Sequence, residues 1–164
     1  MAKNAILLSF LFLSLAAPAE FRGLRPHASR ADYSVTCFTE SIGVGATLVR
    51  SDQVRSLFGP EIDRGYIVVE VGFYSKTRTA FDVRHADFAL RYKPSRNLVR
   101  PADPKAIVAA LSHPLASMLE KTLPEVSTSQ AVAGYLFFPV TEATASYELD
   151  YTGHGAWLTL PLRH

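Results

Sequence analysis

Two short pairs of side chains have the residue types and spacing that could support chemistry. His85 and Asp87 stand two residues apart, so a regular strand would place them on one face, as two metal ligands or a proton relay. Glu148 and Asp150 have the same spacing, but an acid pair would need a cleft and separated pKa values. We interpret the first pair as a surface or edge-strand pair, and the second as solvated carboxylates.

Motifs of zinc, nucleophilic or phosphate chemistry do not occur in the sequence. The histidines lack H-x-x-x-H and H-E-x-x-H spacing, no G-x-S-x-G elbow is present, and Gly43-Val44-Gly45 lacks the lysine of a phosphate loop. Cys37 is the single cysteine, so no intrachain disulfide can form, and its apolar neighbours favour burial. We therefore predict no enzymatic activity, no cofactor, and no catalytic, cofactor-binding or metal-binding residues.

Aromatic side chains are the remaining candidates for a binding surface. Tyr66, Tyr74, Tyr135, Phe137 and Trp157 could occupy the sheet face opposite the main core. Exposed aromatic residues on a sheet can bind sugars, peptides or a partner protein. Because the predicted helices must cover some apolar surface, we interpret these aromatics as packing under the helices or within the core.

The first residues of the chain have the three parts of a secretory signal. Lys3 forms a basic end, the apolar run over 5–17 is too short to span a membrane, and Ala17-Pro18-Ala19 fits a small-x-small cleavage pattern. We predict a signal peptide over 1–19, a flexible leader over 20–32 and one β-sandwich domain over 33–164. The protein is thus expected to be exported, periplasmic or secreted, with no stable membrane span after cleavage.

The charge balance does not indicate a nucleic-acid partner. The chain has 17 lysine and arginine residues against 15 aspartate and glutamate residues. Nucleic-acid binding requires basic residues concentrated on one face. A local excess at Arg22, Arg25 and Arg30 falls in the leader, which we interpret as a solvated tail.

Alternation of apolar and polar residues predicts strands along most of the chain. The clearest strand, Tyr66 to Tyr74, is predicted to be central because both of its faces carry bulky residues. One face is predicted to hold Ile67, Val69, Val71 and Phe73, and the other Tyr66, Val68, Glu70 and Tyr74. Further strands are predicted over 34–38, 44–49, 79–83, 87–92, 132–138, 146–151 and 156–162.

Helices and one tight turn interrupt this pattern. A short helix is predicted over 51–58, with Ser51 as N-cap and Gly59 as C-cap, and further helical turns between Asp103 and Leu123, where Asp103 is the N-cap. The turn over 152–155 contains two glycines that can take positive φ. About seven strands without βαβα alternation favour an immunoglobulin-like antiparallel sandwich with a short helical insertion.

Four stretches carry a resemblance to a known class of domain. They are Gly65-Tyr66-Ile67-Val68-Val69-Glu70-Val71, Ala86-Asp87-Phe88-Ala89-Leu90-Arg91, Ala133-Gly134-Tyr135-Leu136-Phe137-Phe138-Pro139 and Tyr147-Glu148-Leu149-Asp150-Tyr151. Their order over 33–162 resembles exported immunoglobulin-like β-sandwich domains of unknown function from bacterial envelope proteins. The resemblance implies no catalytic residues.

The resulting hypothesis is a non-enzymatic binding or accessory domain of the cell envelope, with an unidentified protein or glycan as its partner. Such a domain would act through a sheet face, a sheet edge or a loop, and addition of a strand to an edge is physically the cheapest mode. The alternative is a small periplasmic metal-binding protein or enzyme that uses His85 and Asp87.

Overall fold

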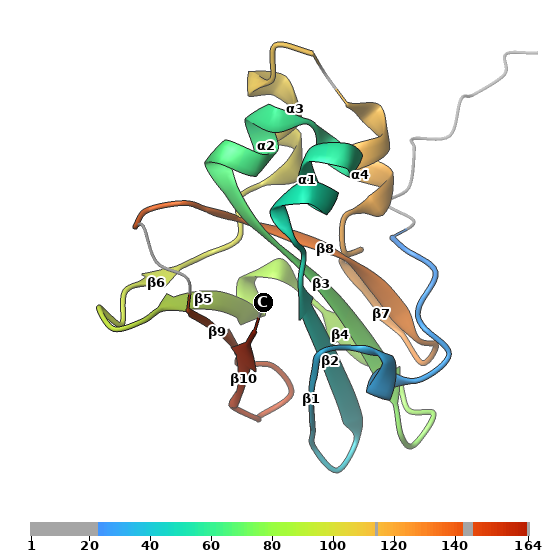
Figure 1. The fold of residues 1–164 in the computed structure, drawn as a ribbon. Coiled ribbons are helices and arrows are strands. Elements are labelled where there is room, and N and C mark those ends of the chain that lie inside the picture. The colour runs from blue at the N-terminus through green and yellow to red at the C-terminus, as the bar shows by residue number, and fades with distance from the viewer. Residues whose placement is uncertain (1–22, 114, 143–145, 164) are drawn as a thin grey trace, which may run out of the picture.

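The computed structural model describes residues 23–113, 115–142 and 146–163, so the predicted signal peptide lies outside the described residues. Within these ranges the protein is mainly β, with ten strands in three antiparallel sheets and four short α-helices (Figure 1). None of the described helices has the length and apolar content needed to cross a membrane.

Two four-stranded sheets and one small sheet contain all the strands of the described ranges. The first sheet has the order β1 (Val35–Phe38), β2 (Ile42–Leu48), β3 (Tyr66–Ser75) and β8 (Val132–Pro139). The second sheet has the order β10 (Leu158–Leu162), β9 (Tyr147–Tyr151), β5 (Phe88–Tyr92) and β6 (Leu98–Val99). The small sheet pairs β4 (Phe81–Val83) with β7 (Val126–Thr128).

The helices form two short pairs, one on each side of β3 in the chain. α1 (Ser51–Phe58) and α2 (Pro60–Gly65) lead into β3, whereas α3 (Pro104–Ala110) and α4 (Ala116–Lys121) lie between β6 and β7. Single 3-10 turns, η1 (Arg30–Asp32) and η2 (His85–Asp87), precede β1 and β5.

The main core lies between the first and second sheets. Val69, Val71 and Phe73 of β3 are fully buried against Phe88 and Leu90 of β5, among other side chains. The predicted faces of β3 and its central position are therefore confirmed. Burial of alternate residues on two facing sheets is the reason that this part of the chain forms strands.

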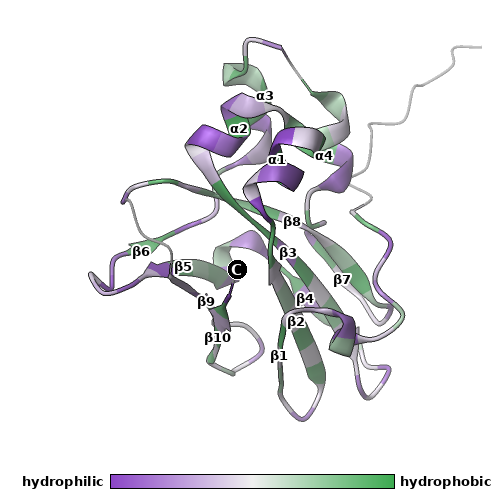
Figure 2. Cartoon of the chain, viewed as in Figure 1, coloured by the Kyte–Doolittle hydropathy of each residue, from purple (hydrophilic) through white to green (hydrophobic). Residues whose placement is uncertain are grey.

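The other face of the first sheet is covered at one end by the helices. Val68, Tyr135 and Phe137 of β3 and β8 form a second apolar cluster, whose helical members are Val54, Phe58, Ile62, Ile107 and Met118. Phe58 packs edge-on against Tyr135 and Phe137, with ring centroids 5.2 and 5.3 Å apart. Figure 2 shows the hydrophilic residues of α1 and α2 together with the apolar strands beneath.

Residues 23–32 cover the other end of this face. The Leu24 amide donates to the Ala133 carbonyl at 2.7 Å, and the Tyr74 hydroxyl donates to the His27 carbonyl at 3.0 Å. The Tyr33 ring lies over Gly72, where an added Cβ would come 2.2 Å from the Tyr33 hydroxyl, so only glycine allows this approach. From residue 23 onward the predicted flexible leader therefore packs on the domain, while the domain boundary itself stays a prediction.

The bounds and caps predicted for the helices agree with the structure in part. α1 has the predicted bounds, Gly59 ends it with φ of 86°, and Asp103 caps α3 by accepting the Lys105 amide at 3.0 Å. Ser51 as N-cap was wrong, because it is the first helical residue and its hydroxyl donates to Asp63 Oδ1 at 2.5 Å. This bond joins α1 to α2, a helix that the sequence pattern did not predict.

The turn before β10 also differs from its prediction. Its positive φ angles belong to His154 (54°) and Gly155 (69°), whereas Gly153 leaves room for the buried Tyr151 hydroxyl. Burial, and then the carboxylate of Asp87, raises the pKa of this hydroxyl, so Tyr151 stays protonated.

The coarse prediction of a mainly β antiparallel domain is confirmed, but the immunoglobulin-like arrangement is not. The small sheet was not predicted as a separate unit, and the strands β6 and β7 were missed. The consecutive strands β1, β2 and β3 stay in one sheet, and a helical layer covers that sheet.

Candidate functional site

His85 and Asp87 do not lie on a regular strand, so the geometry assumed for a metal pair was wrong. They begin and end η2, where His85 Nε2 lies 2.6 Å from the Leu123 carbonyl and the His85 amide donates to Glu125 Oε1 at 2.8 Å. The Asp87 carbonyl accepts the Thr152 amide at 2.8 Å. Among the described residues no group of three or more His, Cys, Asp or Glu side chains could hold a metal ion.

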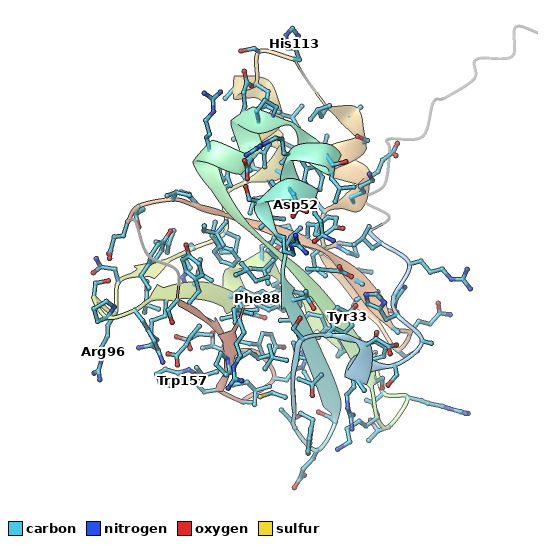
Figure 3. The ribbon with its side chains drawn as sticks, viewed as in Figure 1. Tyr33, Asp52, Phe88, Arg96, His113 and Trp157 are labelled. Atoms are coloured by element: carbon cyan, nitrogen blue, oxygen red, sulfur yellow. The ribbon has the colours of Figure 1, made fainter. Side chains whose placement is uncertain are left out.

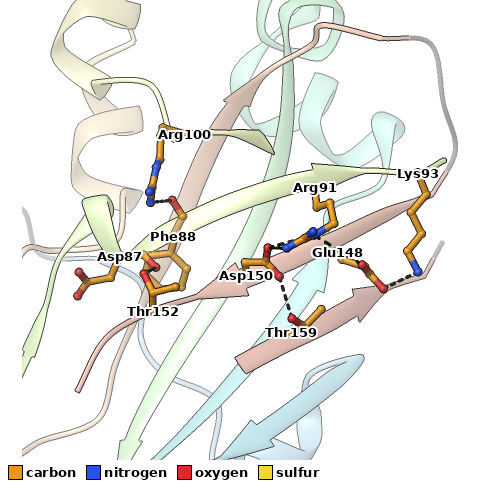
Figure 4. A network of polar contacts seen from close by, with 9 residues as sticks. All are labelled: Asp87, Phe88, Arg91, Lys93, Arg100, Glu148, Asp150, Thr152 and Thr159. Carbon is orange, nitrogen blue, oxygen red and sulfur yellow. Dashed lines mark hydrogen bonds and ion pairs between the residues drawn. The ribbon is translucent and has the colours of Figure 1, made fainter. Parts of the chain in front are cut away.

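Glu148 and Asp150 lie on the outer face of the second sheet, as the alternation of β9 predicts. Asp150 is nevertheless 3% exposed, so the interpretation of it as a solvated carboxylate was wrong. Arg91 Nε lies 3.1 Å from Asp150 Oδ2, which Arg91 Nη2 also contacts, and the Thr159 hydroxyl donates to Asp150 Oδ1 at 2.8 Å (Figure 4). The two strands on either side of β9 thus supply the hydrogen-bond partners of one buried carboxylate.

The network continues along the sheet toward the β5–β6 turn. Lys93 Nζ lies 2.5 Å from Glu148 Oε1, and Arg91 Nε lies 3.9 Å from Glu148 Oε2. Arg91 is therefore held between two carboxylates. Sequence reasoning missed the two basic residues, although Arg91 and Lys93 have the same two-residue spacing as Glu148 and Asp150, which is a signal for cross-strand ion pairs.

A cavity of about 670 Å³ lies over this end of the network. Its lining consists of Arg91, Lys93, Pro94, Arg96, Glu148 and Thr159. Arg96 has a φ of 65°, unusual for a residue with a Cβ, in a turn closed by its amide bond to the Tyr92 carbonyl at 2.8 Å. No described residue forms an ion pair with the Arg96 guanidinium, so this positive charge is available to a partner.

Two large apolar side chains lie at opposite margins of the same face. Leu98 of β6 pairs with Arg91 and is 57% exposed. Trp157 is 70% exposed and directly precedes β10, whose first outward residue is Thr159. Figure 3 shows Trp157 and Arg96 pointing away from the ribbon at the lower left. We call the surface formed by these residues and the ion-pair network the open face.

The five candidate aromatic residues separate into two groups. Tyr66, Tyr135 and Phe137 belong to the cluster under the helices, and Tyr74 packs beneath residues 23–33 against the Tyr33 ring. The interpretation that these side chains pack under the helices or within the core is confirmed for Tyr66, Tyr135 and Phe137, whereas Tyr74 is covered by residues 23–33 instead. It was wrong for Trp157, which remains exposed on the open face.

The edges of the two large sheets offer little backbone for addition of a strand. The outer edge of β8 is closed by amides of Leu24, Ala102 and Leu123, which donate to its carbonyls at 2.7 to 3.0 Å. On the second sheet, β10 contains Pro161, which has no N–H, and β6 has two residues. At β1 the half-buried Cys37, predicted to be buried, places its Sγ 3.9 Å from the Thr159 carbonyl of β10.

Comparison with known proteins identifies no family. No family model matches the chain, and no curated protein matches it in sequence. A solved structure that matches is YcdA of Bacillus subtilis subsp. subtilis strain 168, provisionally described as a lipoprotein. That protein is 17% identical with a TM-score of 0.48, and the match covers 78% of this chain but only 38% of YcdA. A similarity at this level carries no argument about function.

Proposed function

We propose that the protein is an exported, non-enzymatic binding or accessory protein of the cell envelope, periplasmic or secreted, that contacts a partner protein through the open face. One observation carries this proposal. Among the described residues, the outer face of the first sheet is covered by helices and residues 23–33, whereas the open face presents Trp157 and Leu98 to solvent. Tryptophan and arginine are enriched among the residues that dominate protein interfaces.

The charges of the open face support recognition rather than catalysis. Asp150 is bound by Arg91 and Thr159, and Glu148 is bound by Lys93, so neither carboxylate is a free acid or base. The same contacts fix Arg91 in one orientation. A preorganised polar centre between two apolar margins binds with a smaller loss of side-chain entropy.

The partner that fits this face has an acidic patch beside an apolar one. Arg96 supplies a positive charge that no described residue neutralises, and the adjoining cavity is lined by two further basic side chains. An acidic patch would be attracted to it, while Trp157 and Leu98 would bury apolar surface. The export signal and the resemblance to immunoglobulin-like envelope domains remain predictions that agree with this role.

Site-specific photo-crosslinking in the source cells tests the proposal. A benzoyl-phenylalanine at Trp157 should give a discrete, protease-sensitive adduct, whereas the same group at exposed Val126 of the small sheet should not. The Arg96→Glu exchange should abolish that adduct, because it reverses the charge offered to the partner.

Three outcomes of that experiment would overturn the proposal. They are equal adducts from both positions, an adduct that survives Arg96→Glu, and an adduct that a glycosidase but not a protease removes. The last would indicate a glycan partner. Sequencing of the mature N-terminus tests export separately, with Glu20 as the expected first residue.

A further inference from the structure

A groove of about 610 Å³ crosses the outer face of the first sheet, between α1 and residues 27–34. Its floor is a row of cross-strand neighbours, because Glu70 of β3 pairs with Thr47 of β2 and with Tyr135 of β8. The groove lies on the other sheet from the open face and shares no residue with it. Its volume is typical of a site for a small molecule.

Carboxylates outnumber the cations in this groove. Asp32, Asp52 and Glu70 line it together with one histidine, His27, while Arg50 Nη2, outside the lining, lies 3.1 Å from Asp52 Oδ2. His27 Nε2 lies 3.0 Å from Glu70 Oε1, so it contacts one of the two carboxylate oxygens. The Glu70 side chain is only 18% exposed, which makes its electrostatic attraction for a cation stronger than that of a fully solvated carboxylate.

Tyr135 adds to the groove a hydrogen-bonding group that is independent of the carboxylates. The residue is 8% exposed and its ring is fixed against Phe58, yet no described group forms a hydrogen bond with its hydroxyl. The hydroxyl itself is not fully buried, so water in the groove can reach it, and a ligand that fills the groove would replace that water as its hydrogen-bond partner. Burial, and then the charge of Glu70, raises the pKa of this hydroxyl, so it is a neutral phenol that can accept an N–H.

The carboxylates are too dispersed for one metal ion. No described group of three or more His, Cys, Asp or Glu side chains could hold a metal, although three carboxylates line the same groove. A ligand with separated positive charges can reach carboxylates that do not converge. We propose that the groove binds a small organic polycation of the polyamine class, with one ammonium on Glu70 and Tyr135 and another on Asp52 or Asp32.

Calorimetric titration of the mature protein with spermidine tests this proposal. We expect saturable binding of one molecule at low salt, and no binding of the uncharged analogue 1,8-octanediol. Glu70→Gln should weaken binding by about tenfold or more, and Tyr135→Phe by roughly three- to tenfold, since each removes one acceptor. Glu120→Gln removes the same charge from the exposed surface of α4 and should leave the affinity unchanged.

The matched variants make the result decisive. Equal weakening by Glu70→Gln and Glu120→Gln would mean attraction to net charge alone and would overturn the proposal, as would binding that does not saturate. If Glu70→Gln loses its cooperative thermal unfolding, the exposed Asp52→Asn and the conservative Tyr135→Phe decide instead. Full affinity in both of these variants would also overturn the proposal.

Discussion

The outer faces of the two large sheets have opposite surfaces. On the first sheet, Val68, Tyr135 and Phe137 form an apolar face, and helices cover it. On the second sheet the outward residues are Arg91, Glu148 and their ion-pair partners. The apolar cluster that contains this sheet includes no residue of the four described α-helices. The chemistry of the outward residues therefore decides which sheet is covered and which remains open.

The covered face is therefore expected to contribute mainly to the stability of the fold, and the open face mainly to binding of a partner. Each large apolar side chain that is fully buried contributes roughly 1.5–3 kcal/mol by its removal from water. Exposed ion pairs contribute about 0–1 kcal/mol, because water competes for the charges. We expect most single substitutions on the covered face to destabilise the fold. On the open face we expect substitutions to change binding alone, except at the buried Asp150 and at Arg91, which binds it.

The largest effect is expected from Phe137→Ala on the covered face. Phe137 is 1% exposed and contacts Phe58, so its truncation leaves a cavity and should cost about 3–5 kcal/mol. Urea unfolding measures this cost. The control is Phe38→Ala, a 60% exposed ring that should cost less than about 1 kcal/mol. If the two variants lost equal free energy of unfolding, the packing of the helices on the first sheet would not depend on the cluster around Phe137.

The second prediction concerns the one buried charge of the open face. Arg91→Met leaves the Asp150 carboxylate without its cation and should cost about 3 kcal/mol. Lys93→Met breaks the more exposed contact with Glu148 and should cost less than about 1 kcal/mol. Thermal unfolding of the two variants at neutral pH makes the comparison. A smaller loss in Arg91→Met than in Lys93→Met would contradict the assignment of Asp150 as the anchor of the network.

A smaller, pH-dependent effect is expected from Asp63→Asn in α2. The Ser51 hydroxyl, and then Arg55, hold the pKa of the Asp63 carboxyl below its usual range. A lowered folded-state pKa stabilises the fold above the unfolded pKa, and this contribution is lost as pH falls through the folded value. The variant should lose about 1 kcal/mol at pH 7, and the difference should shrink below about pH 4. Unfolding at several pH values measures it, and a difference independent of pH would count against this link.

The smallest change in stability is expected from Trp157→Ala. The ring is 70% exposed, so its removal should change the free energy of unfolding by less than about 0.5 kcal/mol. The same variant should lose the partner predicted for the open face. Destabilisation comparable to that of Phe137→Ala would show that the Trp157 ring belongs to the packed structure and would remove the contrast between the faces.

Local patterns in the sequence predicted much of the fold. The alternation over Tyr66–Tyr74 gave both faces of β3 correctly, because a strand with period two needs no knowledge of its neighbours. The bounds of α1 and the caps at Gly59 and Asp103 are likewise properties of adjacent residues.

Features that depend on distant residues could not be predicted in this way. Asp150 is buried by Arg91, 59 positions away in the chain, and nothing in the alternation of β9 indicates it. Strands as short as β6 and β7 have too few residues for a period to appear. The position of Tyr135, whose hydroxyl forms no hydrogen bond with a described residue, also depends on the packing of α1, so the groove could not be predicted from the sequence.

The closed edge of β8 has a consequence for how the chain reaches its native state. Its backbone is satisfied by Leu24, Ala102 and Leu123, in addition to β3, so four separate stretches must meet before the strand is complete. Contacts of such high contact order form slowly. Until they form, β8 exposes a long apolar edge that can pair with other chains. Aggregation during refolding should therefore begin at this strand.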